Sequence, residues 1–198
     1  MTTYIPSLTL SGTIFNNPLA SIALPIALGT AVGYSTRPKD TKATYLSWTQ
    51  PPLRPPPWLF GPVWTVLYGM MGYAAYRAVH LGTSPFSSPS VISAAKHGAT
   101  LYTIQLGLNL AWMPLFFGLR RPVEAAVDAV ALFGVNAYLA YLWGTEVDAA
   151  AGWLLAPYVV WLGFASYLSL GTGYLNGWDL RDPETKVKGK GKGKGKAL

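Results

Sequence analysis

Long apolar stretches separated by short polar segments dominate the pattern of this chain. Five of them carry few charged side chains, at residues 18–34, 61–79, 99–118, 123–143 and 152–174. A helix needs about 20 mostly apolar residues to cross the hydrocarbon core of a bilayer. The pattern therefore predicts an all-α integral membrane protein built as a bundle of five transmembrane helices. A soluble bundle is the alternative, but soluble helices carry a polar stripe that these stretches do not show.

Prolines predict where the helices begin and where the connectors stiffen. Pro51, Pro52 and residues 55–57 lack an N–H, so we expect an extended, rigid connector before the second helix. Gly61-Pro62 then predicts the start of that helix, because proline is tolerated in a first turn. Serine and proline residues between 80 and 98 predict a loop. The predicted organisation is an uncharged lead-in at 1–17, a transmembrane domain at 18–176 and a basic tail at 177–198.

Charge is distributed unevenly along the 198 residues. The formal net charge is +7, and six lysines alternate mainly with glycine in the last thirteen residues. One predicted side of the membrane holds most of the basic residues, whereas the other holds only Arg77 and Lys96. The positive-inside rule therefore places the C-terminus in the cytosol. The basic residues on the predicted cytosolic side are Arg37, Lys39, Lys42, Arg54, Arg120, Arg121, Arg181 and the six tail lysines.

Candidate chemistry lies on the inward faces of the predicted helices. The third stretch carries polar and aromatic side chains at helical spacing, and the second and fifth add further rings. Such flat walls with sparse polar points suit a planar hydrophobic ligand. In the alternative interpretation, the amide side chains form hydrogen bonds between helices and the aromatic rings contribute only to packing. The residues concerned are Trp64, Tyr68, Tyr102, Gln105, Asn109, Trp112, Phe116, Tyr158, Trp161 and Phe164.

Three motifs give the chain a resemblance to the translocator protein family (TspO, the peripheral benzodiazepine receptor). They are W-L-F-G-P-V-W-T-x-L-Y-x-x-M-G-Y at 58–73, L-Y-x-x-Q-L-x-L-N-x-A-W-x-P-x-F-F-G at 101–118, and L-L-x-P-Y-x-x-W-x-x-F-A at 154–165. The resemblance implies five transmembrane helices, a cavity closed by the first long loop, and frequent homodimers. It also implies binding of porphyrins, sterols and synthetic ligands.

Carried over position by position, the resemblance predicts a ligand site with contributions from four helices. With Tyr68 and Gln105 added from the helical faces, the site comprises Trp58, Gly61, Trp64, Tyr68, Gln105, Asn109, Trp112, Phe116, Asp128, Trp161, Ala165 and Leu168. Arg54, Trp58 and Leu59 are expected to form a lid. The chain departs from the family at Ser169-Leu170, where Asn-Tyr is usual, and this breaks the expected sterol pattern.

Three classes of function follow. The first is a receptor or carrier for porphyrins and other flat lipophilic ligands; it requires no cofactor, and a haem-type molecule would be its ligand. The second is a light- and oxygen-dependent porphyrin-degrading enzyme that uses Trp64 and Trp161, although no acid–base or nucleophile constellation supports ordinary catalysis. The third is a membrane scaffold that recruits partners through its tail.

The expected partners are membrane lipid and a second copy of the chain, and nucleic acid is not expected. The mitochondrial outer membrane is the expected location in a eukaryote. No residue spacing resembles a metal site, and the lack of cysteine excludes thiolate chemistry.

Overall fold

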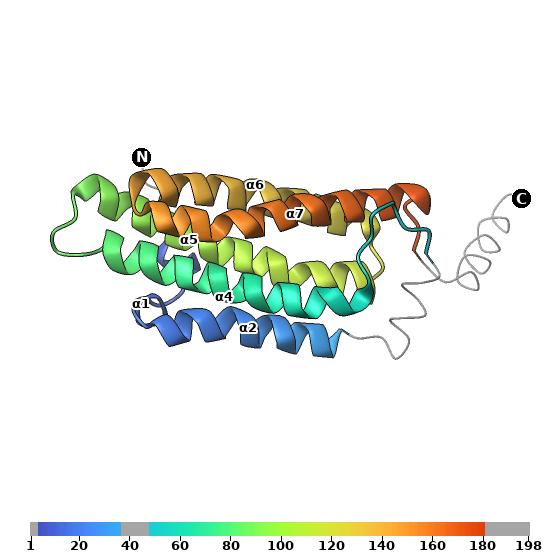
Figure 1. The fold of residues 1–198 in the computed structure, drawn as a ribbon, viewed down its shortest axis with the longest axis horizontal. Coiled ribbons are helices and arrows are strands. Elements are labelled where there is room, and N and C mark those ends of the chain that lie inside the picture. Colours follow the sequence, from blue (N-terminus) through green and yellow to red (C-terminus); the bar gives the residue numbers. More distant parts are fainter. Residues whose placement is uncertain (1–3, 37–47, 181–198) are drawn as a thin grey trace, which may run out of the picture.

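A computed structural model describes residues 4–36 and 48–180, and all regular structure in this part of the chain is helical. Five long helices lie side by side with alternating direction (Figure 1). In chain order the elements are the 3₁₀ turn η1 (Pro6–Leu8), α1 (Gly12–Phe15), α2 (Pro18–Ser35), α4 (Pro57–Gly82), α5 (Pro89–Met113), the π-helical turn η2 (Pro114–Gly118), α6 (Pro122–Glu146) and α7 (Ala149–Leu175).

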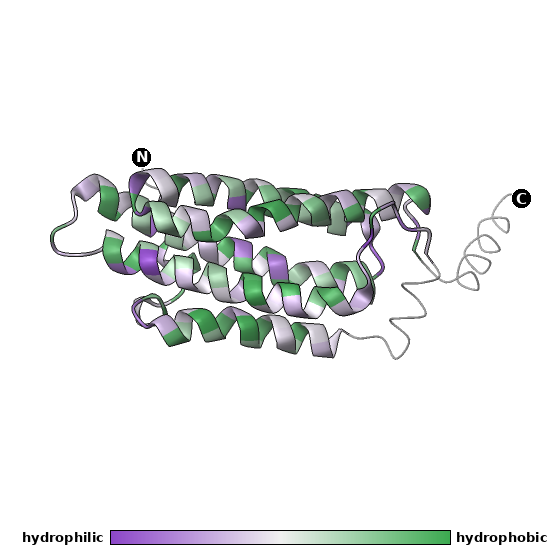
Figure 2. Cartoon of the chain, viewed as in Figure 1, coloured by the Kyte–Doolittle hydropathy of each residue, from purple (hydrophilic) through white to green (hydrophobic). Residues whose placement is uncertain are grey.

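Three of the long helices, α2, α6 and α7, are long and apolar enough to cross a membrane. Hydrophobic residues recur along all of the long helices, with strongly hydrophilic residues at few positions (Figure 2). The all-helical prediction is confirmed, and the described part of the chain contains five long helices together with the short α1.

Several helix starts lie earlier than predicted. α4 begins at Pro57 and not at Gly61, so Trp58 and Leu59 belong to its first turn. A proline at the first helical position costs no hydrogen bond, because that N–H has no partner within the helix. The same arrangement opens α5 at Pro89, where the Ser88 hydroxyl accepts a hydrogen bond from Val91 N. The predicted loop over 80–98 was therefore wrong, since only residues 83–88 separate α4 from α5.

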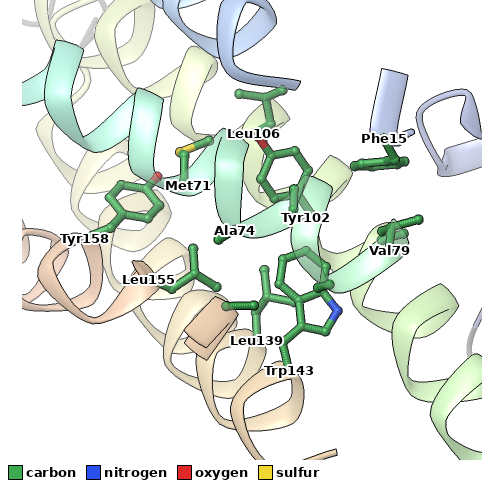
Figure 3. Packing of buried hydrophobic residues seen from close by; sticks show 14 of the residues in the cluster. Phe15, Met71, Ala74, Val79, Tyr102, Leu106, Leu139, Trp143, Leu155 and Tyr158 are labelled. Atoms are coloured by element: carbon green, nitrogen blue, oxygen red, sulfur yellow. The ribbon is translucent and has the colours of Figure 1, made fainter. Parts of the chain in front are cut away.

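The core runs along the middle of the bundle. Met71, Ala74, Tyr102, Leu139 and Trp143 are buried there, and their side chains converge from three helices (Figure 3). Small residues allow the helices to approach closely. A Cβ on Gly152 of α7 would lie 2.6 Å from Gly144 Cα of α6, so glycine is required at this crossing.

The lead-in folds back onto the bundle. Leu10 N donates a hydrogen bond to the Thr103 hydroxyl of α5, and Phe15 packs edge-on against Tyr102 with ring centroids 5.8 Å apart. The hydroxyl groups of α5 thus satisfy backbone groups of an irregular segment at this end of the bundle, as backbone near a membrane requires.

An ion pair ties α4 to the turn between α6 and α7. Arg77 Nε donates to Asp148 Oδ2 at 2.7 Å, and Asp148 Oδ2 also accepts from Ala151 N at 3.2 Å. The hydrogen bond from Arg77 holds the pKa of Asp148 below its ordinary value of 3.8. A carboxylate with a depressed pKa stabilises the folded state above its unfolded pKa, and this stabilisation disappears as the pH falls through the folded value.

We expect Asp148→Asn to lower the free energy of unfolding at pH 7 by about 1 kcal/mol, because asparagine keeps the helix cap and removes the charge. Measured by denaturant unfolding in detergent, the deficit should shrink as the pH falls below about 4. Glu146→Gln is the control, since Glu146 is exposed at the same turn. A deficit that stays constant down to the lowest pH would contradict the role of the charge.

Candidate functional site

A continuous chain of hydrogen-bonded side chains crosses the middle of the bundle. Tyr68 donates from its hydroxyl to Asn109 Oδ1 at 2.6 Å, and Asn109 Nδ2 donates to the Tyr158 hydroxyl at 2.8 Å. Tyr158 in turn donates to Gln105 Oε1 at 3.1 Å, and Asn136 Nδ2 donates to the same oxygen at 3.2 Å. These five residues, which we call the polar chain, connect α4, α5, α6 and α7.

Burial makes the polar chain costly to disrupt. Gln105, Asn136 and Tyr158 are each 0% exposed and Asn109 is 6% exposed. A buried polar group without a partner loses its hydration without compensation. Four members of the polar chain were predicted from the sequence to face the interior of the bundle, whereas Asn136 was not. The amide of Asn136 within an apolar stretch could have revealed it, because a polar group inside a membrane-spanning helix needs a hydrogen-bond partner within the bundle.

Aromatic rings form a wall beside the polar chain. Trp64 lies 5.3 Å from Tyr68 and 6.1 Å from Tyr158 between ring centroids. Trp161 crosses Trp64 edge to face at 6.5 Å and also contacts Phe60 at 5.9 Å. The structure therefore brings together Trp64, Tyr68, Gln105, Asn109 and Trp161, as predicted for one site.

Trp112 and Phe116 belong to a second cluster near the end of the bundle. Their rings stack 4.9 Å apart, and Trp48 packs on Phe116 at 5.6 Å. Phe116 is buried together with Trp48, Ala125 and Leu180, whereas Trp112 is partly buried against this group. The residues expected to line a single cavity thus fall into two aromatic clusters.

The other residues predicted for the ligand site differ in how deeply they are buried and in which helices they contact. Asp128 is 8% exposed on α6, a helix that packs mainly against α5 and α7. Ala165 and Leu168 are half-buried on α7, while Gly61 is exposed. Trp58 is 72% exposed, so it does not cover the site in this structure.

Several buried polar atoms near these clusters have no hydrogen-bond partner in the described part of the chain. They include the acceptor Asp128 Oδ2 and the indole donors Trp112 Nε1 and Trp161 Nε1. Each unpaired buried group requires an explanation, and a polar atom of a bound ligand is one. They provide a few fixed polar points among apolar rings.

The connector before α4 is docked onto α7. We call residues 48–56 the strap. Thr49 N donates to Asn176 Oδ1 at 3.1 Å, and Asn176 Nδ2 donates to Thr49 O at 2.8 Å. Tyr167 donates from its hydroxyl to Pro52 O at 3.1 Å. The exposed Arg54 lies in the strap, whereas the other two predicted lid residues lie in α4.

Two surface hollows, of ≈ 380 Å³ and ≈ 390 Å³, lie outside the predicted site. The first is bounded by residues 7–10 and α5, and the second lies beside His80 and residues 83–85. The rings of Trp64, Tyr158 and Trp161 pack against one another where the cavity was expected. A flat ligand must therefore separate these rings in order to bind between them. Across residues 4–36 and 48–180, no group of three or more His, Asp or Glu side chains is placed to hold a metal ion.

Comparison with known proteins gives consistent matches over most of the chain. The model of the TspO/MBR family matches residues 21–175. A translocator protein homolog of Schizosaccharomyces pombe is 40% identical over 164 residues, which is 82% of this chain and 94% of that protein. The tryptophan-rich protein TspO of Chlorobaculum tepidum is 37% identical over 164 residues, covering 81% and 99%. The translocator protein of Bos taurus is 36% identical over 152 residues, covering 77% and 86%.

Proposed function

The chain belongs to the TspO/MBR family, and on this premise we propose that it is a membrane receptor or carrier for porphyrins and other flat lipophilic molecules, sterols among them. We also propose that all five long helices cross the membrane. α4 and α5 have 26 and 25 residues, which is sufficient length for a span. A ligand would lie within the bundle, between α4, α5 and α7.

The observation that carries this proposal is the position of Trp64. Its ring contacts Tyr68, Tyr158 and Trp161, and two of these contacts are to members of the polar chain. A flat ligand that inserts beside Trp64 gains aromatic stacking, and the buried hydrogen-bonding groups alongside orient it.

Titration of the purified protein in detergent with protoporphyrin tests the proposal. We expect saturable quenching of tryptophan fluorescence with one ligand per chain. Quenching that rises linearly with porphyrin and matches that of free tryptophan in the same micelles would exclude the site.

The proposed orientation rests on the distribution of basic residues in the sequence, to which the described residues contribute only three at one end of the bundle and two at the other. Arg54 lies in the strap, which is docked where α7 ends, and Arg120 and Arg121 lie just before α6, whereas Arg77 pairs with Asp148 at the turn between α6 and α7 and Lys96 lies near the start of α5. Arg37, Lys39, Lys42, Arg181 and the tail lysines fall outside the described residues. The proposed arrangement places the strap and the C-terminus in the cytosol, and the mitochondrial outer membrane is the proposed location in a eukaryote.

We expect protease added to intact organelles to remove a C-terminal tag and to leave an N-terminal tag protected. The reason is that the basic end of the bundle stays on the cytosolic side. Detergent permeabilisation, which should expose both tags, is the control. Protection of the C-terminal tag on intact organelles would reverse the proposed orientation.

The strap is proposed to control how fast a ligand leaves. Asn176→Leu removes both hydrogen bonds to Thr49. The net value of such bonds is about 0.5–1.5 kcal/mol each, so we expect porphyrin release in stopped-flow to accelerate at least about fivefold. Trp58→Ala should leave the rate unchanged, because Trp58 is 72% exposed. Equal release rates in wild type and Asn176→Leu would remove the strap from the mechanism.

A further inference from the structure

We propose that Asn136 is a specificity-determining residue of the ligand site, because it fixes the direction of every hydrogen bond in the polar chain. As a result, the hydroxyl of Tyr68 offers a bound ligand an acceptor and not a donor. The inference rests on the proposed function only for the ligand; the direction of the bonds is a property of the protein alone.

The orientation of the Asn136 amide is set by its own helix. Its Nδ2 atom lies 2.9 Å from Leu132 O. A backbone carbonyl can only accept, so the atom that faces it must be the amide nitrogen. The second N–H of the same nitrogen then faces Gln105 Oε1 at 3.2 Å. Rotating the amide by half a turn would place two acceptors against each other and lose both bonds.

This orientation is transmitted along the polar chain one bond at a time. Gln105 must present its oxygen to Asn136, so the same oxygen receives the Tyr158 hydroxyl proton. With its proton committed, Tyr158 accepts from Asn109 Nδ2. The Asn109 oxygen is left to face Tyr68, and it accepts the Tyr68 hydroxyl proton at 2.6 Å.

Tyr68 is the end of the polar chain that a ligand can meet. As a residue it is partly exposed, whereas Gln105, Asn136 and Tyr158 are fully buried. Its hydroxyl lies against Gly29 of α2, so a ligand that bonds to the oxygen must displace this contact. Its ring is 5.3 Å from Trp64, the centre of the aromatic wall. A phenol has one proton and two lone pairs. Because the proton is used internally, the group available to a ligand is the oxygen, which favours flat molecules that carry an N–H or O–H at their edge.

Without Asn136, the hydrogen bonds of the polar chain could run in the opposite direction at no loss of bonds. Gln105 Nε2, which has no partner now, would donate to Tyr158. Tyr158 would donate to Asn109, and Asn109 would donate to Tyr68, so the number of bonds between these four residues is unchanged. The Tyr68 proton would then be free to donate to a ligand. With Asn136 present, this reversed chain loses one bond and brings two amide nitrogens together.

Nuclear magnetic resonance tests the direction of the bonds without any ligand. The chain has two glutamines, Gln50 and Gln105, so ¹⁵N labelling of the glutamine side-chain amides gives two pairs of proton signals, one pair per residue. In Asn136→Leu, or in the smaller Asn136→Ala if the first does not fold, we expect a Gln105 amide proton to shift downfield as it gains an acceptor. The Gln50 signals should not move and serve as an internal reference. An unchanged Gln105 signal in a folded variant would overturn the proposal.

Ligand choice is tested with carbazole and dibenzofuran, flat molecules of nearly equal shape. Carbazole carries an N–H donor, whereas dibenzofuran carries an ether oxygen in the same position. We expect wild type to prefer carbazole by about three- to tenfold, the usual value of one hydrogen bond. Asn136→Leu should remove or invert the preference. Tyr68→Phe should remove it as well, and adding Asn136→Leu to Tyr68→Phe should have no further effect.

The two measurements separate this proposal from the function on which it rests. A Gln105 shift together with failure of the wild type to bind porphyrin, carbazole or dibenzofuran would contradict the proposed function and leave the direction of the bonds established. Binding of all three molecules with the same carbazole preference in wild type and Asn136→Leu would overturn the role of Asn136 in specificity.

Discussion

Replacing Gly72 by alanine is expected to destabilise the protein by about 2–3 kcal/mol, the cost of forcing an extra methyl group into a close-packed contact. Gly72 lies where α4 crosses α2. A Cβ there would lie 2.8 Å from Ile22 Cα and 2.9 Å from Ser21 C. These are backbone atoms, which cannot rotate aside as the end of a side chain can. The strain is relieved only if α2 moves away from α4.

Gly69→Ala is the matched control, on the same helix and with the same change. A Cβ on Gly69 meets no atom within 4 Å. Alanine favours a helix over glycine by about 1 kcal/mol, so this variant should be as stable as wild type or more so. Denaturant unfolding of both variants in one detergent gives the comparison. Equal stability of Gly72→Ala and Gly69→Ala would show that α2 and α4 are not packed as closely as described.

Trp64→Ala should give the largest loss of ligand affinity among single substitutions of the proposed site. Buried aromatic anchors of this kind commonly contribute about 2 kcal/mol or more, which corresponds to about a 30-fold rise in Kd. Trp64 contacts three other rings, so its removal also loosens Trp161 and Tyr158. Protoporphyrin binding measured by absorbance, which does not depend on tryptophan emission, gives the Kd directly.

Trp153→Ala controls for the loss of one tryptophan. Trp153 is 76% exposed on α7, away from the polar chain. Its replacement should leave porphyrin affinity unchanged. Equal Kd values for Trp64→Ala and wild type would mean that the ligand binds elsewhere in the bundle.

The sequence predicted the number and approximate position of the long helices because length and apolarity are local properties of the chain. It misplaced the start of α4 because proline was treated as excluded from the helix, although it is tolerated at the first position, where Pro57 lies. Similarly, His80 and His97 were placed in a loop, whereas each lies inside a helix.

The candidate site was predicted only in part. Helical spacing brought Gln105 and Asn109 onto one face of α5, which the structure confirms by their shared bonds to Tyr158. The separation of Trp112 and Phe116 into another cluster depends on Trp48, which arrives from a distant segment. Spacing within one helix carries no information about such a contact. The same holds for the partner of Asn136, which becomes known only once α5 and α6 are packed together.

The short connection between α6 and α7 has a consequence for biosynthesis. Only residues 147–148 separate the two helices, and Gly144 and Gly152 hold their backbones in close contact. Because two residues tie the helices together, we expect both to enter the bilayer as one hairpin. In the proposed orientation the turn that is carried across the membrane holds Glu146 and Asp148 and no basic residue. Acidic residues hinder translocation far less than basic ones, so this hairpin can form as soon as α7 has left the ribosome.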